Sequence, residues 1–220
     1  MKKMEKVKFH EGLDGIIRDI NAMGEHALGM LVDSVKAFKD QNVEMADEVE
    51  ERKHQLAFYD RDIEQRALML LTLYQPMARD LRTIATILKM DTYLTRIGRY
   101  AKDISKATRK MADKPHLAKL VLIPKQAEMV AGMVRDALQA FREDDVSLID
   151  DFTDRDDEVD AIWSTVFREC ITYMMEDPSN ITPCTYYILV SWHLERCGDH
   201  ACKIAEKVHY KVTGEHIEIK

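Results

Sequence analysis

Residues 190–208 read VSWHLERCGDHACKIAEKV and carry a regular apolar pattern. Its apolar side chains recur at spacings of three and four, at Val190, Leu194, Cys197, Ala201, Ile204 and Val208. Because an α-helix turns once in about 3.6 residues, these side chains form one stripe that must be buried against neighbouring helices. The stretch therefore predicts a long amphipathic helix packed among others.

The same helical period recurs earlier in the chain, at Val159, Trp163, Val166, Cys170 and Met174. No alternating apolar–polar pattern of comparable length, which would indicate a β-strand, is present. Only 8 Gly and 5 Pro punctuate the 220 residues, so turn signals are few and helices are expected to be long. The sequence predicts an all-α fold.

The chain repeats itself internally. In the earlier part of each half the matching residues are 103 positions apart: Ala37 with Ala140, Phe38 with Phe141, Val43 with Val146, Arg52 with Arg155 and Ile63 with Val166. In the later part they are 100 apart: Arg96 with Arg196, Gly98 with Gly198, Ala101 with Ala201 and Ile104 with Ile204. These matches indicate an ancestral duplication.

Each half is predicted to hold three helices. The expected ranges are about 10–40, 43–73 and 77–111 in the first half and 124–142, 147–176 and 182–210 in the second. Short connections favour antiparallel neighbours, so the predicted fold is two tandem three-helix bundles with six helices in all. The halves are residues 1–111 and 124–220, joined by a linker at residues 112–123.

Prolines set several of these limits. Pro76 is expected in the first turn of the third helix, where its missing N–H costs little. The fifth helix should end before Pro178, because a residue preceding proline resists the helical conformation. Thr182 is predicted to cap the sixth helix, with Pro183 in its first turn.

Composition excludes several classes of protein. The net charge of −7 and the pI near 5.6 argue against a nucleic-acid-binding protein. No apolar run follows the basic N-terminus, and no stretch reaches about 18 apolar residues, so neither a secretory signal nor a membrane span is expected. We therefore predict a cytoplasmic protein that meets a membrane only through partners. Its 4 cysteines, Cys170, Cys184, Cys197 and Cys202, are expected to be buried free thiols.

Carboxylates gather in the second half. Glu195 and Asp199 are four residues apart and leave one side of the sixth helix, opposite its apolar stripe; Asp156 and Asp160 have the same spacing on the fifth helix. Like charges at this spacing repel, and a cation would remove the repulsion. Oxygen donors alone suit hard ions such as Mg²⁺, Ca²⁺, Mn²⁺ or iron. A solvated acidic surface is the alternative interpretation.

The stretch from Leu194 to Glu206, with its Leu-Glu-Arg-x-Gly-Asp-His-Ala core, resembles the signature helix of the PhoU family. The tail Tyr210–Glu215 and the first-half residues Gln75–Pro76 and Asp80–Arg82 are also similar to that family. The resemblance covers about residues 10–215, including the duplication.

The resemblance implies a six-helix, two-repeat cytosolic protein that is often a homodimer. It implies negative regulation of phosphate uptake and of phosphate-starvation signalling, through the nucleotide-binding subunit of a phosphate ABC transporter and, in many bacteria, a sensor histidine kinase. It also implies a cluster of iron or another cation such as Mn, Mg, Ca or, less readily, Zn. Its ligands would be Asp156, Asp160, Glu195 and Asp199.

The first repeat departs from this motif. Thr95 and Arg99 stand at the positions of Glu195 and Asp199, and Lys53 and Ala57 at those of Asp156 and Asp160. The acids are lost and two positions have become basic, which would oppose a cation. We therefore expect at most one metal cluster per chain, in the second repeat.

Three other interpretations are open. A ferritin-like di-metal oxidoreductase would use Glu-x-x-His pairs, and the chain has Glu51 with His54 and Glu206 with His209. A helical scaffold unrelated to phosphate is another possibility. The basic residues of the third helix suit either an acidic partner or phosphate, or are an ordinary solvated surface: Arg96, Arg99, Lys102, Lys106 and Lys110. Phosphate-binding loops and hydrolase motifs are missing, so we predict that the protein is not an enzyme.

Overall fold

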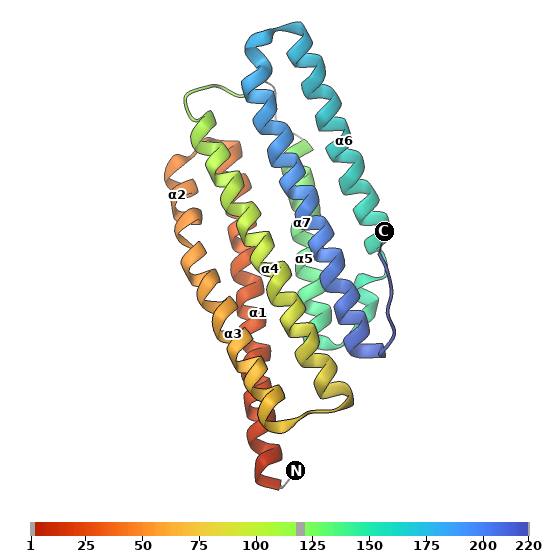
Figure 1. Ribbon diagram of the computed structural model, residues 1–220. Helices are drawn as coiled ribbons and strands as arrows, with labels where there is room; N and C mark the ends of the chain where they lie inside the picture. Colours follow the sequence, from red (N-terminus) through yellow and green to blue (C-terminus); the bar gives the residue numbers. More distant parts are fainter. Residues whose placement is uncertain (1–2, 118–121, 220) are drawn as a thin grey trace.

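The computed structural model describes residues 3–117 and 122–219 of the chain. The helices, drawn in Figure 1, are α1 (Lys3–Asp40), α2 (Val43–Glu51), α3 (Lys53–Tyr74), α4 (Ala78–Met111), α5 (Leu122–Glu143), α6 (Phe152–Glu176) and α7 (Ile181–Thr213). Two 3₁₀ turns, η1 (Val146–Ile149) and η2 (Pro178–Asn180), complete the described chain, in which no strand occurs. The all-α prediction is confirmed, with α2 and α3 replacing the predicted second helix, which is interrupted at Arg52.

Several predicted helix limits are wrong. Pro76 lies outside α4, because Gln75 ends α3 with a left-handed φ of 46° and the chain extends to Met77 before turning again. Thr182 does not cap the sixth helix but lies inside the first turn of α7. The cap in this region is Asp177, whose side chain accepts from the Ser179 N–H and starts η2. Residues 118–121 of the predicted linker lie outside the described residues.

The duplication is visible in repeated contacts as well as in repeated residues. Arg52 donates to Asp33 over 2.6 Å, and 103 residues later Arg155 donates to Asp136 over 2.7 Å. Each pair ties the first helix of its repeat to the chain that follows.

The turn after each first helix is also repeated. Gln41 and Asp144, 103 residues apart, adopt left-handed φ angles of 51° and 56°. The next residues, Asn42 and Asp145, accept backbone N–H groups through their side chains and begin the following helix. The turn is therefore inherited with the repeat.

A glycine faces the outer helix in each repeat. A Cβ added to Gly98 of α4 would clash with the Leu56 side chain of α3, whereas one added to Gly198 of α7 would meet Val159 of α6 at 3.5 Å, an ordinary contact distance. The two contacts occupy equivalent positions, so the Arg-x-Gly match marks helix packing.

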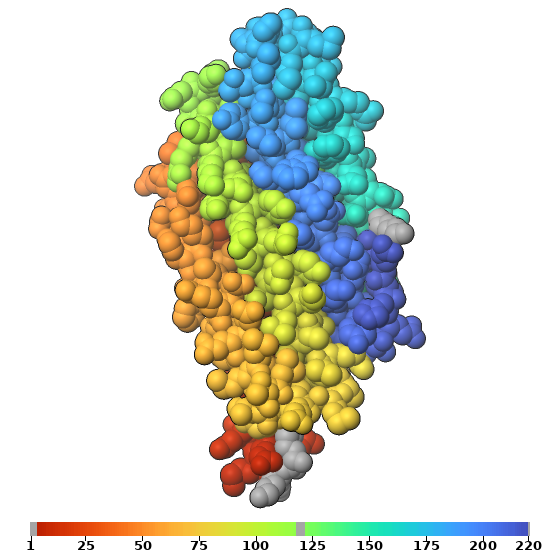
Figure 2. Space-filling model, viewed as in Figure 1, coloured from red at the N-terminus to blue at the C-terminus, as the bar shows by residue number. Residues whose placement is uncertain are grey.

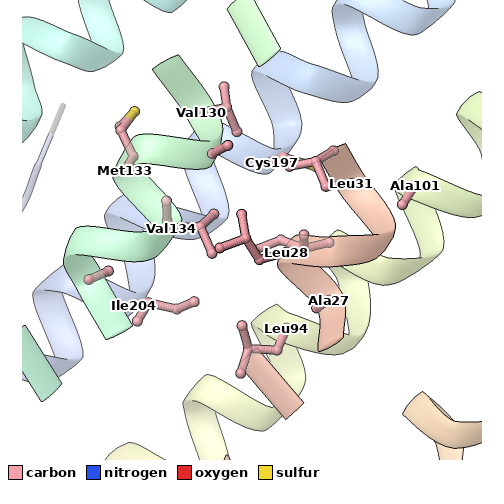
Figure 3. Close-up of a cluster of buried hydrophobic side chains, with 14 of the residues drawn as sticks. Ala27, Leu28, Leu31, Leu94, Ala101, Val130, Met133, Val134, Cys197 and Ile204 are labelled. Atoms are coloured by element: carbon pink, nitrogen blue, oxygen red, sulfur yellow. The ribbon is translucent and has the colours of Figure 1, made fainter. Parts of the chain in front are cut away.

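The two repeats share one core. The inner helices α1, α4, α5 and α7 pack on one another, while α3 covers α1 and α4 and α6 covers α5 and α7 (Figure 1). Side chains from both repeats meet between them, and Figure 3 shows Leu28, Leu31, Leu94, Val134 and Ile204 in one cluster. The halves are side by side, with their apolar stripes directed at each other.

The helices α4 and α7 run antiparallel along this interface. Tyr93 stacks on His200 at 5.7 Å between ring centroids, and Tyr100 lies 5.4 Å from His193, so rising numbers on one helix meet falling numbers on the other. Since α4 and α7 are equivalent helices of the two repeats, a pseudo-twofold axis passes between them.

A buried lysine joins α7 to the end of α5. The Lys211 ammonium donates to the Phe141 carbonyl over 2.8 Å, pairs with Asp144 over 2.7 Å and lies 4.0 Å from the centre of the Phe141 ring. Asp144 also pairs with Arg79 of α4. The lysine thus satisfies the C-terminal end of α5, where backbone carbonyls lack helical partners.

Replacing this lysine should destabilise the fold. We expect Lys211→Ala to lower the free energy of unfolding by about 2 kcal/mol, because it leaves a buried carbonyl and part of the Asp144 charge without a partner. Urea denaturation measures the change. Lys207→Ala, one turn earlier and without an ion pair among the described residues, should change stability by less than about 0.5 kcal/mol. Equal losses in both variants would contradict the assigned role.

Candidate functional site

Four carboxylates from α6 and α7 form an acidic cluster, defined as Asp156, Asp160, Glu195 and Asp199. Gly198 of α7 lies beside α6, where a Cβ on this glycine would be in ordinary contact with Asp156 Oδ1, at 3.7 Å. Electrostatic repulsion connects them, since Asp199 raises the pKa of the other three. The predicted site residues are therefore neighbours in the fold.

Burial is the main influence on these acids. Partial burial, then Asp199, raises the pKa of Glu195 to about 7, and burial also raises the pKa of Asp156 and Asp160. The Oε2 atom of Glu195 is buried and has no hydrogen-bond partner in the described chain. The helical spacing predicted that Glu195 lies opposite the apolar stripe of its helix. In the fold, α6 covers that side of α7 and partly buries Glu195.

Two neighbours offset part of the repulsion. Arg196 pairs with Asp199 over 2.6 Å within α7, and the Cys202 thiol donates to Asp156 over 3.5 Å. Among the described residues Glu195 and Asp160 have no ion pair or hydrogen bond of this kind, and only the more distant charge of Arg196 lowers their pKa, so the negative charge is unevenly compensated. A cation near these two carboxylates would lower the electrostatic cost of the cluster.

The donor chemistry of the acidic cluster fits a hard cation, since carboxylate oxygens are the ligands such ions prefer. In residues 3–117 and 122–219, however, no three His, Cys, Asp or Glu side chains are already arranged around a point where an ion could sit. The cluster would have to rotate its side chains inward to bind one. The donor atoms thus suit a hard cation in their chemistry, but the side chains are placed as mutually repelling carboxylates are, apart from a common centre.

The equivalent place in the first repeat has the opposite character. A hollow of about 210 Å³ there is lined by residues including Lys53, Ala57, Thr95 and Arg99. Lys53 pairs with Glu50 over 3.6 Å, and Thr95 donates its hydroxyl to Asp60 over 3.2 Å. Lys53 and Arg99 line this hollow at the positions of Asp156 and Asp199 in the second repeat, so the donor set of a hard metal ion is lost.

One acidic pair was missed in the sequence. Asp91 of α4 is only 5% exposed, and its Oδ1 atom has no conventional hydrogen-bond donor among the described residues. Burial first, and then Asp60 of α3, raises the pKa of Asp91 to about 8. The available signal was position: Asp91 interrupts the buried stripe between Ile87 and Leu94. An acid in that place must be neutral or paired.

The other candidates do not join the acidic cluster or form a second metal site in the described fold. His193 and His200 lie between α7 and α4 against tyrosine rings, as interface histidines. His54 and Glu51 expose 73% and 74% of their side chains, so they do not point into the bundle as a ferritin-like centre requires. The four cysteines are free and buried, as predicted.

The fold and this site define a class: internally duplicated helical proteins with paired carboxylates on facing helices. The chain belongs to the PhoU domain family, whose model matches residues 20–108 and 123–208, one match in each repeat.

Named relatives resemble the chain over most of its length. It is 35% identical to the phosphate-specific transport system accessory protein PhoU homolog of Rhizobium meliloti, over 94% of this chain and 87% of that protein. It is 34% identical to the protein of the same name from Caulobacter vibrioides, over 95% and 91%.

Solved structures agree with the fold. The crystal structure of PhoU from Pseudomonas aeruginosa has a TM-score of 0.91 at 33% identity, covering 94% of this chain and 100% of that one. The phosphate transport system regulatory protein PhoU from Streptococcus pneumoniae, at 24% identity, has a TM-score of 0.87 over 96% and 99% and supports the fold alone.

The buried acid of α4 makes stability depend on pH. Since the pKa of Asp91 is raised to about 8, the folded state binds its proton more tightly than the unfolded state, and stability falls as pH rises from about 4 to about 8. Asp91→Asn cannot lose this proton. We expect the free energy of unfolding of the variant, relative to that of the wild type, to increase across that window by at most about 1.4 kcal/mol per pH unit.

Urea denaturation at pH 5, 6, 7 and 8 measures this difference. Glu48→Gln, at an exposed position of α2, is the matched control and should follow the wild type. A constant difference between Asp91→Asn and the wild type over the whole range would show that Asp91 is already ionised at low pH.

Proposed function

We propose that the protein is an accessory regulator of a phosphate-specific transport system and acts by binding other proteins. The observation that carries this proposal is the match of both repeats to the PhoU domain, together with relatives whose names state that role. The expected partners are the nucleotide-binding subunit of the phosphate ABC transporter and, where one exists, a sensor histidine kinase. The protein would hold these partners in a low-activity state when phosphate is plentiful.

A binding role is supported by the character of the surface. Large apolar side chains are exposed on α6 and α7, among them Phe167, Met175, Ile181 and Trp192. Such residues scattered singly are common, but several on adjacent helices suit a contact with another chain. None of the described helices is long and apolar enough to cross a membrane, so membrane contact would pass through the transporter.

A homodimer is part of the same proposal, with these exposed apolar side chains as the contact. Light scattering on the purified chain measures the mass. A monomer mass at all concentrations up to about 100 μM would contradict the homodimer, because the association would then be weaker than specific dimers typically show.

Deleting the gene tests the regulatory role. We expect the deletion strain to take up phosphate faster than the parent, and to express phosphate-responsive genes, in medium rich in phosphate. Unchanged uptake and unchanged expression would count against the proposal. Capture of the transporter's nucleotide-binding subunit by the tagged chain separates this role from that of a scaffold unrelated to phosphate.

We also propose that the acidic cluster binds one metal centre in each chain, made of iron or a comparable hard cation. Asp156, Asp160, Glu195 and Asp199 would supply oxygen ligands, and the ion would supply the positive charge that the cluster lacks. The repulsion of Glu195 by Asp199, Asp160 and Asp156 supports this, because it adds to burial in raising the pKa of Glu195 and a cation would relieve it.

Metal content tests this part directly. For the chain purified without chelator and loaded with ferrous iron or manganese, elemental analysis should give at most one cluster per chain. Glu195→Gln together with Asp156→Asn should remove it, since two of four ligands are lost. Thr95→Ala, at the equivalent first-repeat position, is the matched control and should keep it. Two equally occupied sites, or full retention in the double variant, would contradict the assignment.

A further inference from the structure

A cleft of about 660 Å³ runs over the surface where α4 meets α7. These helices lie side by side on the surface turned toward the viewer in Figure 2, in yellow-green and blue. Lys89, Thr92, Tyr93 and Arg96 line the α4 side of the cleft. Its volume is within the range of small-molecule sites in proteins.

The pseudo-twofold axis brings equivalent arginines to this cleft. Arg96 and Arg196 are the same residue of the two repeats, 100 positions apart, and both line it. Because α4 and α7 are antiparallel, residues near the axis meet their own counterparts. The duplication has therefore placed two guanidinium groups in one cleft.

The two arginines differ in their partners. Arg196 pairs over 2.6 Å with Asp199, three residues on in α7. The residue three positions after Arg96 is Arg99, the counterpart of Asp199, so this internal carboxylate is missing. Within residues 3–117 and 122–219, Arg96 makes no ion pair or hydrogen bond, which leaves its charge available.

A second uncompensated cation lies on the same side of α4. Lys89 precedes Arg96 by seven residues, two helical turns, and also makes no ion pair in the described chain. Lys203, across the cleft, is already engaged by Glu206 over 2.7 Å. The free positive charge of the cleft therefore belongs to Arg96 and Lys89.

A buried histidine adds a polar group between these cations and the α7 side. His200 is 6% exposed, lines the cleft and stacks between Tyr93 and Tyr100 at 5.7 and 5.8 Å. Neither ring nitrogen has a hydrogen-bond partner among the described residues. A neutral imidazole carries one N–H donor, and leaving it unpaired in a buried place is costly.

We propose that the cleft between α4 and α7 binds the phosphate group of a small molecule, held by Arg96 and Lys89 with a ring N–H of His200 as third donor. Charge-assisted hydrogen bonds from a guanidinium suit phosphate oxygens, and the anion supplies the acceptor that His200 lacks. Three carboxylates also line the cleft: Asp156, Asp199 and Glu218. Asp199 is paired with Arg196 over 2.6 Å and Asp156 accepts the Cys202 thiol, so the anion would be held by Arg96 and Lys89, with which none of these acids pairs in the described chain. The site deepens the regulatory function proposed above but rests on its own geometry.

Calorimetric titration of the purified chain tests the site, with inorganic phosphate in one arm and ATP in the other. We expect saturable binding of one ligand per chain. Tighter binding of phosphate identifies the free anion as the ligand, and tighter binding of ATP identifies the phosphate group of a nucleotide; either supports the site. No saturable heat in either arm overturns it.

Variants locate the binding. Arg96→Ala should weaken it about tenfold or more, as expected for a lost charge-assisted contact. Arg99→Ala is the matched control on the same helix: it lines the first-repeat hollow, not this cleft, and should change affinity less than about twofold. Equal weakening by both variants would mean diffuse charge attraction and would overturn the site.

Arg99→Asp is the sharper test. It introduces the carboxylate that the second repeat has at this position, three residues after the arginine, and should pair with Arg96 as Asp199 pairs with Arg196. We expect it to weaken binding about as much as Arg96→Ala does. Arg96 and Arg99 are exposed, so these variants should fold, which circular dichroism checks. Binding unchanged in Arg99→Asp counts against Arg96 as a ligand.

His200→Phe tests the third donor, since phenylalanine keeps a ring between the tyrosines but has no N–H. A loss of about threefold to tenfold is expected for one hydrogen bond. Because this position is buried, the binding result counts only if the variant has the same unfolding temperature as the wild type. The exposed variants keep the test decisive if this one does not fold. These binding experiments use the isolated chain, whereas the regulatory role is tested by phosphate uptake in a deletion strain. A failure of the binding site is therefore distinguishable from a failure of the proposed regulatory function.

Discussion

The antiparallel packing of α4 against α7 is the contact on which the rest of the molecule depends. It joins equivalent helices of the two repeats, so the stripe of one half is buried by the stripe of the other. Leu94 and Ala101 on α4 and Cys197 and Ile204 on α7 lie in the same cluster (Figure 3). Burial of apolar area is the main term that stabilises such a fold, and here residues of both repeats contribute to one core.

This contact also explains how function could divide between two copies of one unit. The structural contacts are the same in both repeats: the Arg52–Asp33 pair recurs as Arg155–Asp136, and the turns that follow the first helices also recur. Other positions on the helices have diverged, as in Arg99 and Asp199. Surface substitutions cost little stability, so charge could change while the packing stayed. One repeat became acidic at this position and the other basic.

Most of the fold could be predicted from periodicity and duplication. The spacing of three and four in α7 needed no partner to be recognised, and the carboxylates at Glu195 and Asp199 followed from their spacing and from the family resemblance. Helix ends were harder, because Gln75 leaves α3 through a left-handed turn that no glycine announced. The partly buried state of Glu195 was not predictable, because it depends on α6 packing over that side of α7.

By itself, the sequence determined the helices, the duplication and the family, because these are written in local spacing and in the similarity of one half to the other. Only the tertiary structure decided what lies across from what. It placed Asp91 in the core beside Asp60, set His200 between two tyrosines of the other repeat and brought Arg96 and Arg196 to one cleft. The physical reason is that burial, pKa and the pairing of charges depend on neighbours from distant parts of the chain, which helical periodicity cannot specify.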